Sequence, residues 1–206
     1  MRYSDLPTAD VAVRKVAALA ALCRTRPVAA ASIESFAIEL NLWPTSAVID
    51  WYLILQRSPA LPGRDARLAQ AGQILHARLN LQGTAMTFST EASDYWWWLM
   101  ASPDVNANRL MLAVLDQPDW QKDMGRLARG AMGRMKQGHW NTTVANAWGV
   151  LAIEKFSKKF ENEAVGGTST VRLGGVSKDA AWNGAKAPSQ SMPWQSGAQE
   201  LAITHA

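Results

Sequence analysis

Apolar residues recur at three- and four-residue intervals over most of the chain, which is the spacing of amphipathic helices. Val13, Val16 and Ala20 mark one such face, and Leu68 and Leu75 lie on another. A helix beginning at Thr45 is apolar on all sides, which indicates burial from several directions. We predict helices over residues 8–24, between 27 and 43, and over 45–55, 64–79, 90–100, 103–115, 124–136 and 142–160.

The clearest helix signal is the stretch 138–160. Gly138 indicates a turn, and Asn141 and Thr142 are side-chain types that satisfy the free N–H groups of a helix start. Apolar residues then recur at helical spacing as far as Ile153, and lysines gather near the end, where cations suit the helix macrodipole. We predict a capped core helix around which the rest of the chain is organised.

A threonine stands six residues before a tryptophan at three places, starting at Thr45, Thr90 and Thr142. The intervals of about 45 and 52 residues would each hold two helices and two turns, which is typical of a solenoid or a closed toroid of helices. The alternative is that threonine caps before tryptophan-bearing helices recur by chance. The repeat, if real, predicts a mainly α protein built of helical hairpins.

The pattern changes near residue 164. Residues 166–175 alternate small, polar and β-branched side chains between glycine pairs, as a short strand between turns would, and 199–205 alternates again. Residues 185–193 are rich in Pro and Ser and indicate a loop. We therefore predict a helical domain over 1–163 and a short β-rich tail over 164–206, whose strands cannot bury a face alone.

Composition limits the possible functions. The chain has 206 residues, 48% of them hydrophobic, which is enough for one sizeable core. Ten tryptophans indicate thick contacts between helices. The net charge of +4 is mild and the cations are scattered, so no concentrated basic face indicates nucleic-acid binding.

The cysteine count and the hydropathy of the chain bear on the cellular compartment of the protein. Cys23 is the one cysteine, so an internal disulfide is excluded. The apolar run 16–22 is too short to cross a bilayer, and the polar start at residues 1–7 lacks the apolar core of a signal peptide. We expect no membrane span and no export signal in this chain.

No catalytic, cofactor-binding or metal-binding residue is predicted. His76, His139 and His205 are far apart in the sequence and match no metal-ligand spacing, and no paired-carboxylate motif is present. We expect His76 to pack at the edge of its helix and His139 to lie in a turn. Asp94 is expected in the first turn of a helix, where an acid suits the macrodipole.

Two further features could suggest a ligand site. The run 96–98 is three tryptophans, but adjacent helix positions point about 100° apart, so we expect core packing rather than a flat stacking platform. Gly166–Gly167 and Gly174–Gly175 lack the strand–loop–helix setting of a phosphate loop, and we expect hairpin turns there.

Long strings in the second half resemble the thioester-containing helical domain of bacterial alpha-2-macroglobulins. These strings are residues 138–148 with Leu151 and Phe156, residues 94–102, and residues 106–111. Residues 167–204, with Met192-Pro193-Trp194 and 201–205, are similar to the sandwich strands that follow that domain. The resemblance covers most of the chain and is strongest over 90–160 and 192–205.

The resemblance implies a partial α/α toroid, and a role in a protease-trapping inhibitor of the bacterial periplasm or cell envelope. In such inhibitors, cleavage of a bait region triggers a conformational change that entraps the protease. The implied partners are proteases, through the full-length protein, and the remaining macroglobulin domains.

The sequence departs from the family at its reactive centre. The family thioester joins Cys and Gln in a Cys-x-Glu-Gln motif, whereas Cys23 is followed by Arg24-Thr25-Arg26. The bait region, the preceding sandwich modules and the first part of the toroid are also absent. We therefore expect a non-enzymatic fragment of such an inhibitor, without a thioester of its own.

Two alternatives remain. One is an enzyme built on an α/α toroid, which would need clustered carboxylates or metal ligands at the toroid mouth. The other is a stand-alone helical-repeat module that binds a peptide in an exposed tryptophan groove, a proposal that buried tryptophans would oppose.

Overall fold

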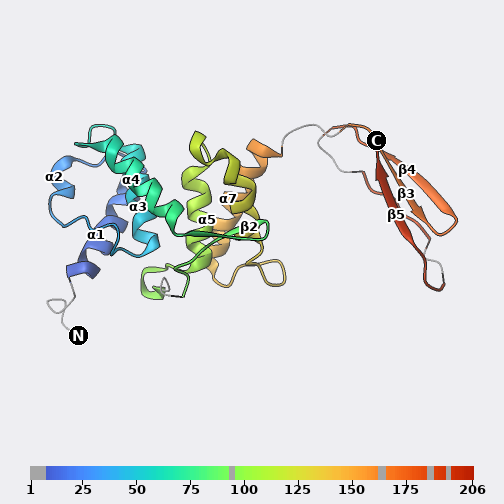
Figure 1. Ribbon diagram of the computed structural model, residues 1–206, viewed down its shortest axis with the longest axis horizontal. Helices are drawn as coiled ribbons and strands as arrows, with labels where there is room; N and C mark the ends of the chain where they lie inside the picture. Colours follow the sequence, from blue (N-terminus) through green and yellow to red (C-terminus); the bar gives the residue numbers. More distant parts are fainter. Residues whose placement is uncertain (1–7, 93–95, 162–165, 185–187, 194–195) are drawn as a thin grey trace. The chain divides into compact units, whose positions relative to one another are not determined.

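The computed structural model describes residues 8–92, 96–161, 166–184, 188–193 and 196–206. The chain divides into two compact units, Met1–Phe156 and Ser157–Ala206. The first unit carries most of the helices and a small hairpin, and the second carries a three-stranded sheet (Figure 1). The helix α7 (Thr143–Phe160) runs from the first unit into the second.

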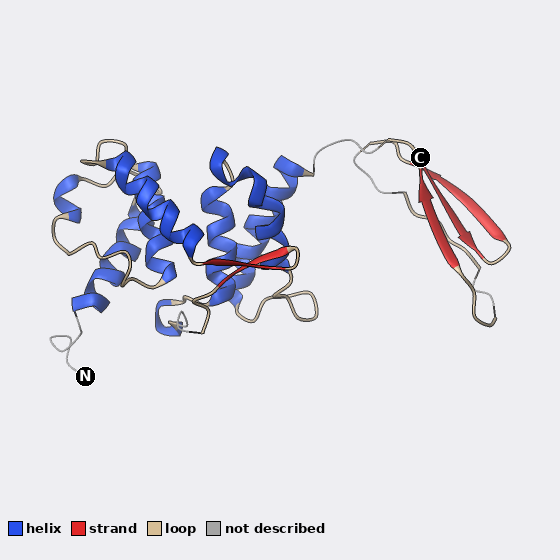
Figure 2. Ribbon diagram, viewed as in Figure 1, coloured by secondary structure: helices blue, strands red, loops and turns tan. Residues whose placement is uncertain are grey.

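The expected mainly α toroid is wrong. The protein is 49% helical and 16% strand, with two small antiparallel sheets, so its content is mixed α and β (Figure 2). The helices are also unequal: the four-residue α2 (Ala30–Ile33) lies between the fifteen-residue α1 (Thr8–Leu22) and the thirteen-residue α3 (Thr45–Arg57). A regular series of helical hairpins would need helices of similar length in successive pairs.

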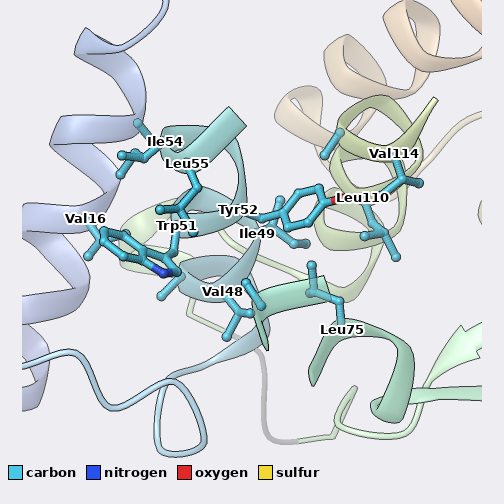
Figure 3. Close-up of a cluster of buried hydrophobic side chains, with 14 of the residues drawn as sticks. Val16, Val48, Ile49, Trp51, Tyr52, Ile54, Leu55, Leu75, Leu110 and Val114 are labelled. Atoms are coloured by element: carbon cyan, nitrogen blue, oxygen red, sulfur yellow. The ribbon is translucent and has the colours of Figure 1, made fainter. Parts of the chain in front are cut away.

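The core of the first unit is built around α3. As its composition predicts, this helix is buried on several sides, and it packs against α1, α4 (Arg64–Ala77) and α5 (Pro103–Val114). Figure 3 shows Trp51 on the side of α3 that faces Val16 of α1, and Tyr52 on the side that faces Leu110 of α5. Burying such large side chains supplies most of the hydrophobic stabilisation of the unit.

A β-hairpin stands where the sequence analysis left an irregular segment. Its strands are β1 (Leu79–Gln82) and β2 (Ala85–Phe88), joined through Gly83, whose φ of 60° is left-handed. The hairpin packs on α6 (Met124–Met132) at a glycine, since a Cβ at Gly130 would lie 1.9 Å from the Met86 carbonyl oxygen. The absence of a side chain at Gly130 thus allows the hairpin backbone to approach α6 closely.

The expected helices over 27–43 and 90–100 are also wrong. In the first segment only α2 is helical, although Ile33, Leu40 and Trp43 are buried as their apolar character predicts. In the second, the described residues form turns and the short 3₁₀ helix η2 (Trp97–Leu99), after which Met100 has a φ of 54°. Trp96 and Ala101 pair their backbones instead, which closes a loop just before α5.

Two of the three repeated threonines meet, but not as equivalent positions of a repeat. Thr45 Oγ1 lies 2.9 Å from Thr90 Oγ1 and accepts a hydrogen bond of 3.1 Å from Arg78 Nη1. Arg78 Nη2 also donates to the carbonyl oxygens of Leu40 and Trp43, at 3.1 and 2.9 Å. Thr45 begins α3, whereas Thr90 lies in a turn after β2, so the two threonines are not equivalent positions of a helical repeat. They meet because both belong to one hydrogen-bond network.

The later helices follow the sequence signals more closely. Ser102 caps α5, because its Oγ accepts a hydrogen bond from the Val105 N–H. The segment after Pro118 begins as the 3₁₀ helix η3 (Pro118–Asp123) and continues as α6, which ends near Gly133, earlier than the expected Lys136. Thr142 caps α7 by accepting from the Ala145 N–H at 3.1 Å, which confirms the predicted cap. The expected core role of this helix is wrong, because the buried residues of α7 are Ala145, Gly149 and Ala152 and the core is built around α3.

The second unit is an antiparallel sheet in the order β4 (Val176–Ala181), β3 (Thr168–Leu173) and β5 (Leu201–His205). The strands expected near 166–175 and 199–205 are confirmed, and β4 was not anticipated. The register places Leu173 opposite both Val176 and Leu201, and Val171 opposite Ile203. These residues share one face, where Leu201 and Ile203 are 58% and 63% exposed.

Candidate functional site

An open cleft of about 730 Å³ lies beside the hairpin in the first unit. We call it the Arg134 cleft. The hairpin, the C-terminal part of α6 and the loop that leads to α7 enclose it, and the start of α5 closes one end. Its lining consists of Gln82, Ala85, Thr87, Phe88, Glu91, Asp104, Arg129, Gly130, Gly133, Arg134, Lys136, Gln137, His139 and Asn141.

Arg134 joins the walls of this cleft. Its Nε donates to Asp104 Oδ1 at 2.7 Å, and its Nη1 donates to Glu91 Oε1. All three side chains are mostly withdrawn from solvent. Burial opposes the charge of Arg134, but the hydrogen bonds from Glu91 and Asp104 outweigh burial and raise the pKa of the guanidinium. One cation is thus held by two carboxylates.

Local structure positions both carboxylates. Asp104 lies in the first turn of α5, where the helix macrodipole favours a negative charge, and its Oδ2 accepts a 3.4 Å hydrogen bond from the Asn141 N–H. Glu91 follows β2 in the turn that contains Thr90. Because Arg134 lies just beyond α6, its two ion pairs connect the end of the hairpin to both α5 and α6.

The rim of the cleft is formed by backbone turns. Lys136 and His139 form an antiparallel bridge, between which Gln137 has a left-handed φ of 54°. At the other rim, Arg129 Nε donates to the Thr84 carbonyl oxygen at 2.8 Å and so holds the hairpin turn against α6. Amide and hydroxyl side chains therefore line a cleft whose frame is fixed by hydrogen bonds.

The Arg134 cleft is equipped for binding rather than for acid–base chemistry. Both of its carboxylates are ion-paired with Arg134, so neither carboxylate stands apart from that cation in the cleft. His139 is exposed, and its Nδ1 lies 3.0 Å from the Trp140 carbonyl oxygen rather than beside a nucleophile. The volume falls within the range of small-ligand and peptide pockets.

Sequence reasoning did not find this cleft. Glu91 and Asp104 were each interpreted as residues of helix starts, and Arg134 as part of a basic helix. The signal available was that two acids precede a cation-rich helix by 43 and 30 residues. Such separations carry no periodicity, so only the packing of the hairpin onto α6 brings the three together.

The three histidines lie on different elements, as their positions in the sequence predict. His76 of α4 stacks on Trp120 with 3.6 Å between ring centroids, and burial lowers its pKa, which confirms a packing role at the helix edge. His139 lies in the predicted turn at the rim of the Arg134 cleft. His205 of β5 is exposed, with Nδ1 3.0 Å from Ser169 Oγ. No group of three His, Cys, Asp or Glu suited to a metal ion occurs among the described residues.

The other residues singled out by sequence are accounted for as follows. Cys23 is buried, its Sγ donates to the Ala20 carbonyl oxygen at 3.1 Å, and burial raises the pKa of the thiol. The expected core packing is wrong for Trp98, which is 49% exposed and contacts Trp96 at 5.4 Å between centroids. Asp94 lies outside the described residues.

The two glycine pairs have different roles. Gly174 and Gly175 connect β3 to β4, and Gly174 has a φ of 56°, so the predicted hairpin turn is confirmed there. Gly166 and Gly167 precede β3 and form no hairpin; a Cβ at Gly167 would lie 2.4 Å from the Ala206 carbonyl oxygen.

Comparison with protein-family models, with curated proteins and with solved structures finds no match to this chain. The family resemblance therefore stays a prediction. Among the described helices, none has the length and apolar character needed to span a membrane.

Proposed function

We propose that this chain is a non-enzymatic part of a protease-trapping inhibitor of the bacterial alpha-2-macroglobulin kind. Bait cleavage and covalent capture are assigned to other parts of the trap. The chain contributes a structural and binding body, in the periplasm or cell envelope. The toroid that the resemblance implied is not part of this proposal.

The observation that carries the proposal is that two separate strings of the resemblance join in the structure. Asn108 of α5 is fully buried, and its Nδ2 donates to the Ala145 carbonyl oxygen of α7 at 3.3 Å. Asp104, two residues before the first of these strings, accepts from the Asn141 N–H of the second. Similarity at residues that pack against one another is what a shared scaffold would produce.

The turn before α7 shows the same structural role. Asn146 accepts from the Trp140 N–H at 3.0 Å and donates to the carbonyl oxygens of Trp140 and Thr142, both at 2.8 Å. The Trp140 indole donates to the Ala131 carbonyl oxygen of α6, and a Cβ at Gly149 would lie 2.2 Å from its ring. Residues of the resemblance are occupied in fixing the fold, which favours a scaffold over a catalytic centre.

The surroundings of Cys23 also support the proposal that this chain has no thioester of its own. A thiol that is buried, hydrogen-bonded and raised in pKa has little thiolate to react at neutral pH. The exposed apolar face of the β4–β3–β5 sheet is the kind of surface that further domains of a larger assembly cover.

The test is entrapment of an active protease. A C-terminal tag is placed on the chromosomal gene, the cell-envelope fraction is mixed with a broad-specificity protease, and size-exclusion fractions are assayed for the tag. We expect the protease to co-elute with the tagged polypeptide. It should still cleave a small peptide substrate but no longer a folded protein, because entrapment excludes large substrates and leaves the active site intact.

A protease inactivated beforehand is the matched control, since it cannot cleave a bait and should elute alone. The purified 206-residue chain should leave protease activity toward both substrates unchanged. Inhibition by this chain alone would contradict its role as one part of a trap. Failure of active protease to co-elute with the tag would contradict the trap itself.

A second candidate, peptide binding, is favoured by the Arg134 cleft but not in the form first expected. The lining of the cleft contains no tryptophan among the described residues, so a tryptophan groove is not the basis. Gln82, Thr87, Gln137 and Asn141 would supply hydrogen-bonding side chains beside β2. Thr87→Lys should abolish binding of an extended peptide measured by fluorescence polarisation, whereas Lys122→Gln in η3 should not.

A further inference from the structure

A second cavity of the first unit differs from the Arg134 cleft in its charge. It has a volume of about 200 Å³ and opens between the end of α1 and the helices α3, α5 and α7. Four of its lining side chains are cations: Arg24, Arg57, Arg109 and Lys155. We call it the cationic pocket. No carboxylate lines it among the described residues.

Helical spacing aims these cations into one space. Arg57 lies four residues after Leu53 on α3, and Lys155 lies seven residues after Trp148 on α7, so each pair shares a helix face. Arg109 comes from α5. Three helices therefore each present a cation beside apolar side chains, and Arg24 adds a fourth from the turn after α1.

Trp148 holds two of the cations close together. The Arg24 guanidinium carbon lies 4.7 Å from the centre of the indole ring, and that of Arg109 lies 5.4 Å from it. Cation–π attraction to one ring orients both guanidinium groups. Their like charges repel, so their convergence on one indole favours an anion between or beside them.

Among the described residues, one carboxylate is ion-paired with a cation of this cluster. Asp50 lines an adjoining cavity of about 260 Å³ that shares Arg24, Arg109 and Trp148 with the cationic pocket, and its Oδ1 accepts from Arg109 Nη2. Arg24, Arg57 and Lys155 form no ion pair with any described carboxylate. The cluster thus carries four positive charges against one negative charge.

Arg109 also retains an unused donor. Its side chain is only 12% exposed, and its Nε has no hydrogen-bond partner among the described residues. A guanidinium group whose donors are not all satisfied by the protein is the kind of group that binds an oxyanion, and Arg109 lines the cationic pocket. Arg24, Arg57 and Lys155 are exposed, so an anion could reach Arg109 from solvent between them.

We propose that the cationic pocket binds a phosphate group, held by Arg24, Arg57, Arg109 and Lys155 around Trp148. A phosphate dianion matches the net excess of cations better than a single carboxylate, and guanidinium groups bind its oxygens in a fork geometry. The pocket is small and single, so it suits one phosphate group, either free or as a small monoester. This inference does not depend on the proposed protease trap.

The first experiment titrates the purified chain with inorganic phosphate at constant ionic strength, following tryptophan fluorescence and the thermal midpoint. We expect saturable quenching or enhancement from Trp148, and a midpoint that rises with phosphate because a ligand of the folded state stabilises it. Acetate at the same ionic strength should have little effect. An equal response to acetate, or no saturable response to phosphate, would overturn the proposal.

Variants locate the site. Arg24→Gln and Lys155→Gln change exposed residues, so both should fold, and each should weaken phosphate binding about tenfold through loss of a charge-assisted contact. Lys122→Gln removes an equal charge outside the pocket and should leave the affinity unchanged. If Arg24→Gln and Lys155→Gln bound phosphate with the same affinity as the control Lys122→Gln, phosphate would bind elsewhere and the assignment would be overturned.

A third arm distinguishes the two sources of phosphate. Glycerol 2-phosphate carries the same dianion on a small organic group. Binding at least as tight as that of inorganic phosphate would assign the site to monoesters, and much weaker binding would assign it to the free ion. Loss of both responses in Arg24→Gln supports the proposal in either case, whereas retention of both contradicts it.

Discussion

The Arg134 cleft and the cationic pocket are both centred on an arginine of the first unit, yet they balance charge in opposite ways. In the cleft one guanidinium is held by Glu91 and Asp104. In the pocket four cations lie together, and the ion-paired carboxylate found for them among the described residues is that of Asp50, which lines the adjoining cavity. In the cleft, the arginine and its two acids neutralise one another and connect the hairpin, α5 and α6. In the pocket, the positive charge exceeds the negative charge, and the excess is available to a ligand. The comparison teaches that clustered arginines indicate a ligand only where the neighbouring carboxylates are too few to neutralise them.

The largest expected effect is at the buried pair of the pocket. Arg109→Met leaves Asp50 buried without its cation, which should lower the free energy of unfolding at neutral pH by about 3 kcal/mol. Urea denaturation followed by circular dichroism measures this loss. Arg14→Met, which breaks the half-exposed pair with Asp10, is the control and should cost about 0.5 kcal/mol. Equal losses in the two variants would contradict a special role for the buried pair.

Arg134→Met should have the next largest effect. It leaves Glu91 and Asp104 facing each other without a cation, but both are more accessible than Asp50, so we expect a loss of about 2 kcal/mol in unfolding free energy. The same denaturation measurement applies. The double variant Arg134→Met with Glu91→Gln should recover part of the loss, and failure to recover any would mean that packing rather than charge decides this site.

The pH dependence of stability should report on Asp50. Burial raises the pKa of Asp50 above its ordinary value of 3.8, although Arg109 opposes the rise. The folded state then binds this proton more tightly than the unfolded state, so the contribution of Asp50 to stability is greatest below 3.8 and declines as pH rises through its folded pKa.

Replacing the titrating group tests this sign. The stability of Asp50→Asn relative to the natural chain should increase from acidic to neutral pH, because the variant lacks the ionisation that buried Asp50 undergoes. Chemical denaturation at a series of pH values measures the difference. A relative stability that decreases over the same range would show that Arg109 lowers the pKa of Asp50 overall.

The smallest effect should also be the one with opposite sign. Lys155→Gln removes one of the mutually repelling cations from the pocket and should raise the free energy of unfolding in phosphate-free buffer by about 0.3 kcal/mol. Added salt should reduce this gain, since it screens the repulsion. A loss of stability as large as that of Arg134→Met would mean that Lys155 is already balanced by a carboxylate.

Helical periodicity predicted α1, α3, α4, α5 and α7 because their own residues carry the apolar face. Ser102 and Thr142 cap helices within three residues of themselves, so local sequence suffices to find them. The hairpin β1–β2 was missed because its four-residue strands are short, although Leu79, Leu81, Met86 and Phe88 alternate around a Gly-Thr turn. The regular toroid is wrong as well, since the protein also holds two small antiparallel sheets.

Neither arginine site could be predicted from the sequence, and the reason is distance along the chain. Arg134 bonds residues 30 and 43 positions away, and Arg109 bonds Asp50 across 59 positions. No periodicity links such residues, and only the packing of α5 against α3 and α6 decides which acids meet which cations.

By itself the sequence determined where the stable helices begin, that Cys23 has no disulfide partner, and that strands follow the last helix. These features depend on residues near one another in the chain or on composition. Tertiary structure alone decided that the fold is mixed α and β, that Arg134 is neutralised, and that Arg109 keeps a cationic pocket around Trp148. Charges and cavities depend on which distant surfaces come into contact, and a one-dimensional pattern does not contain that choice.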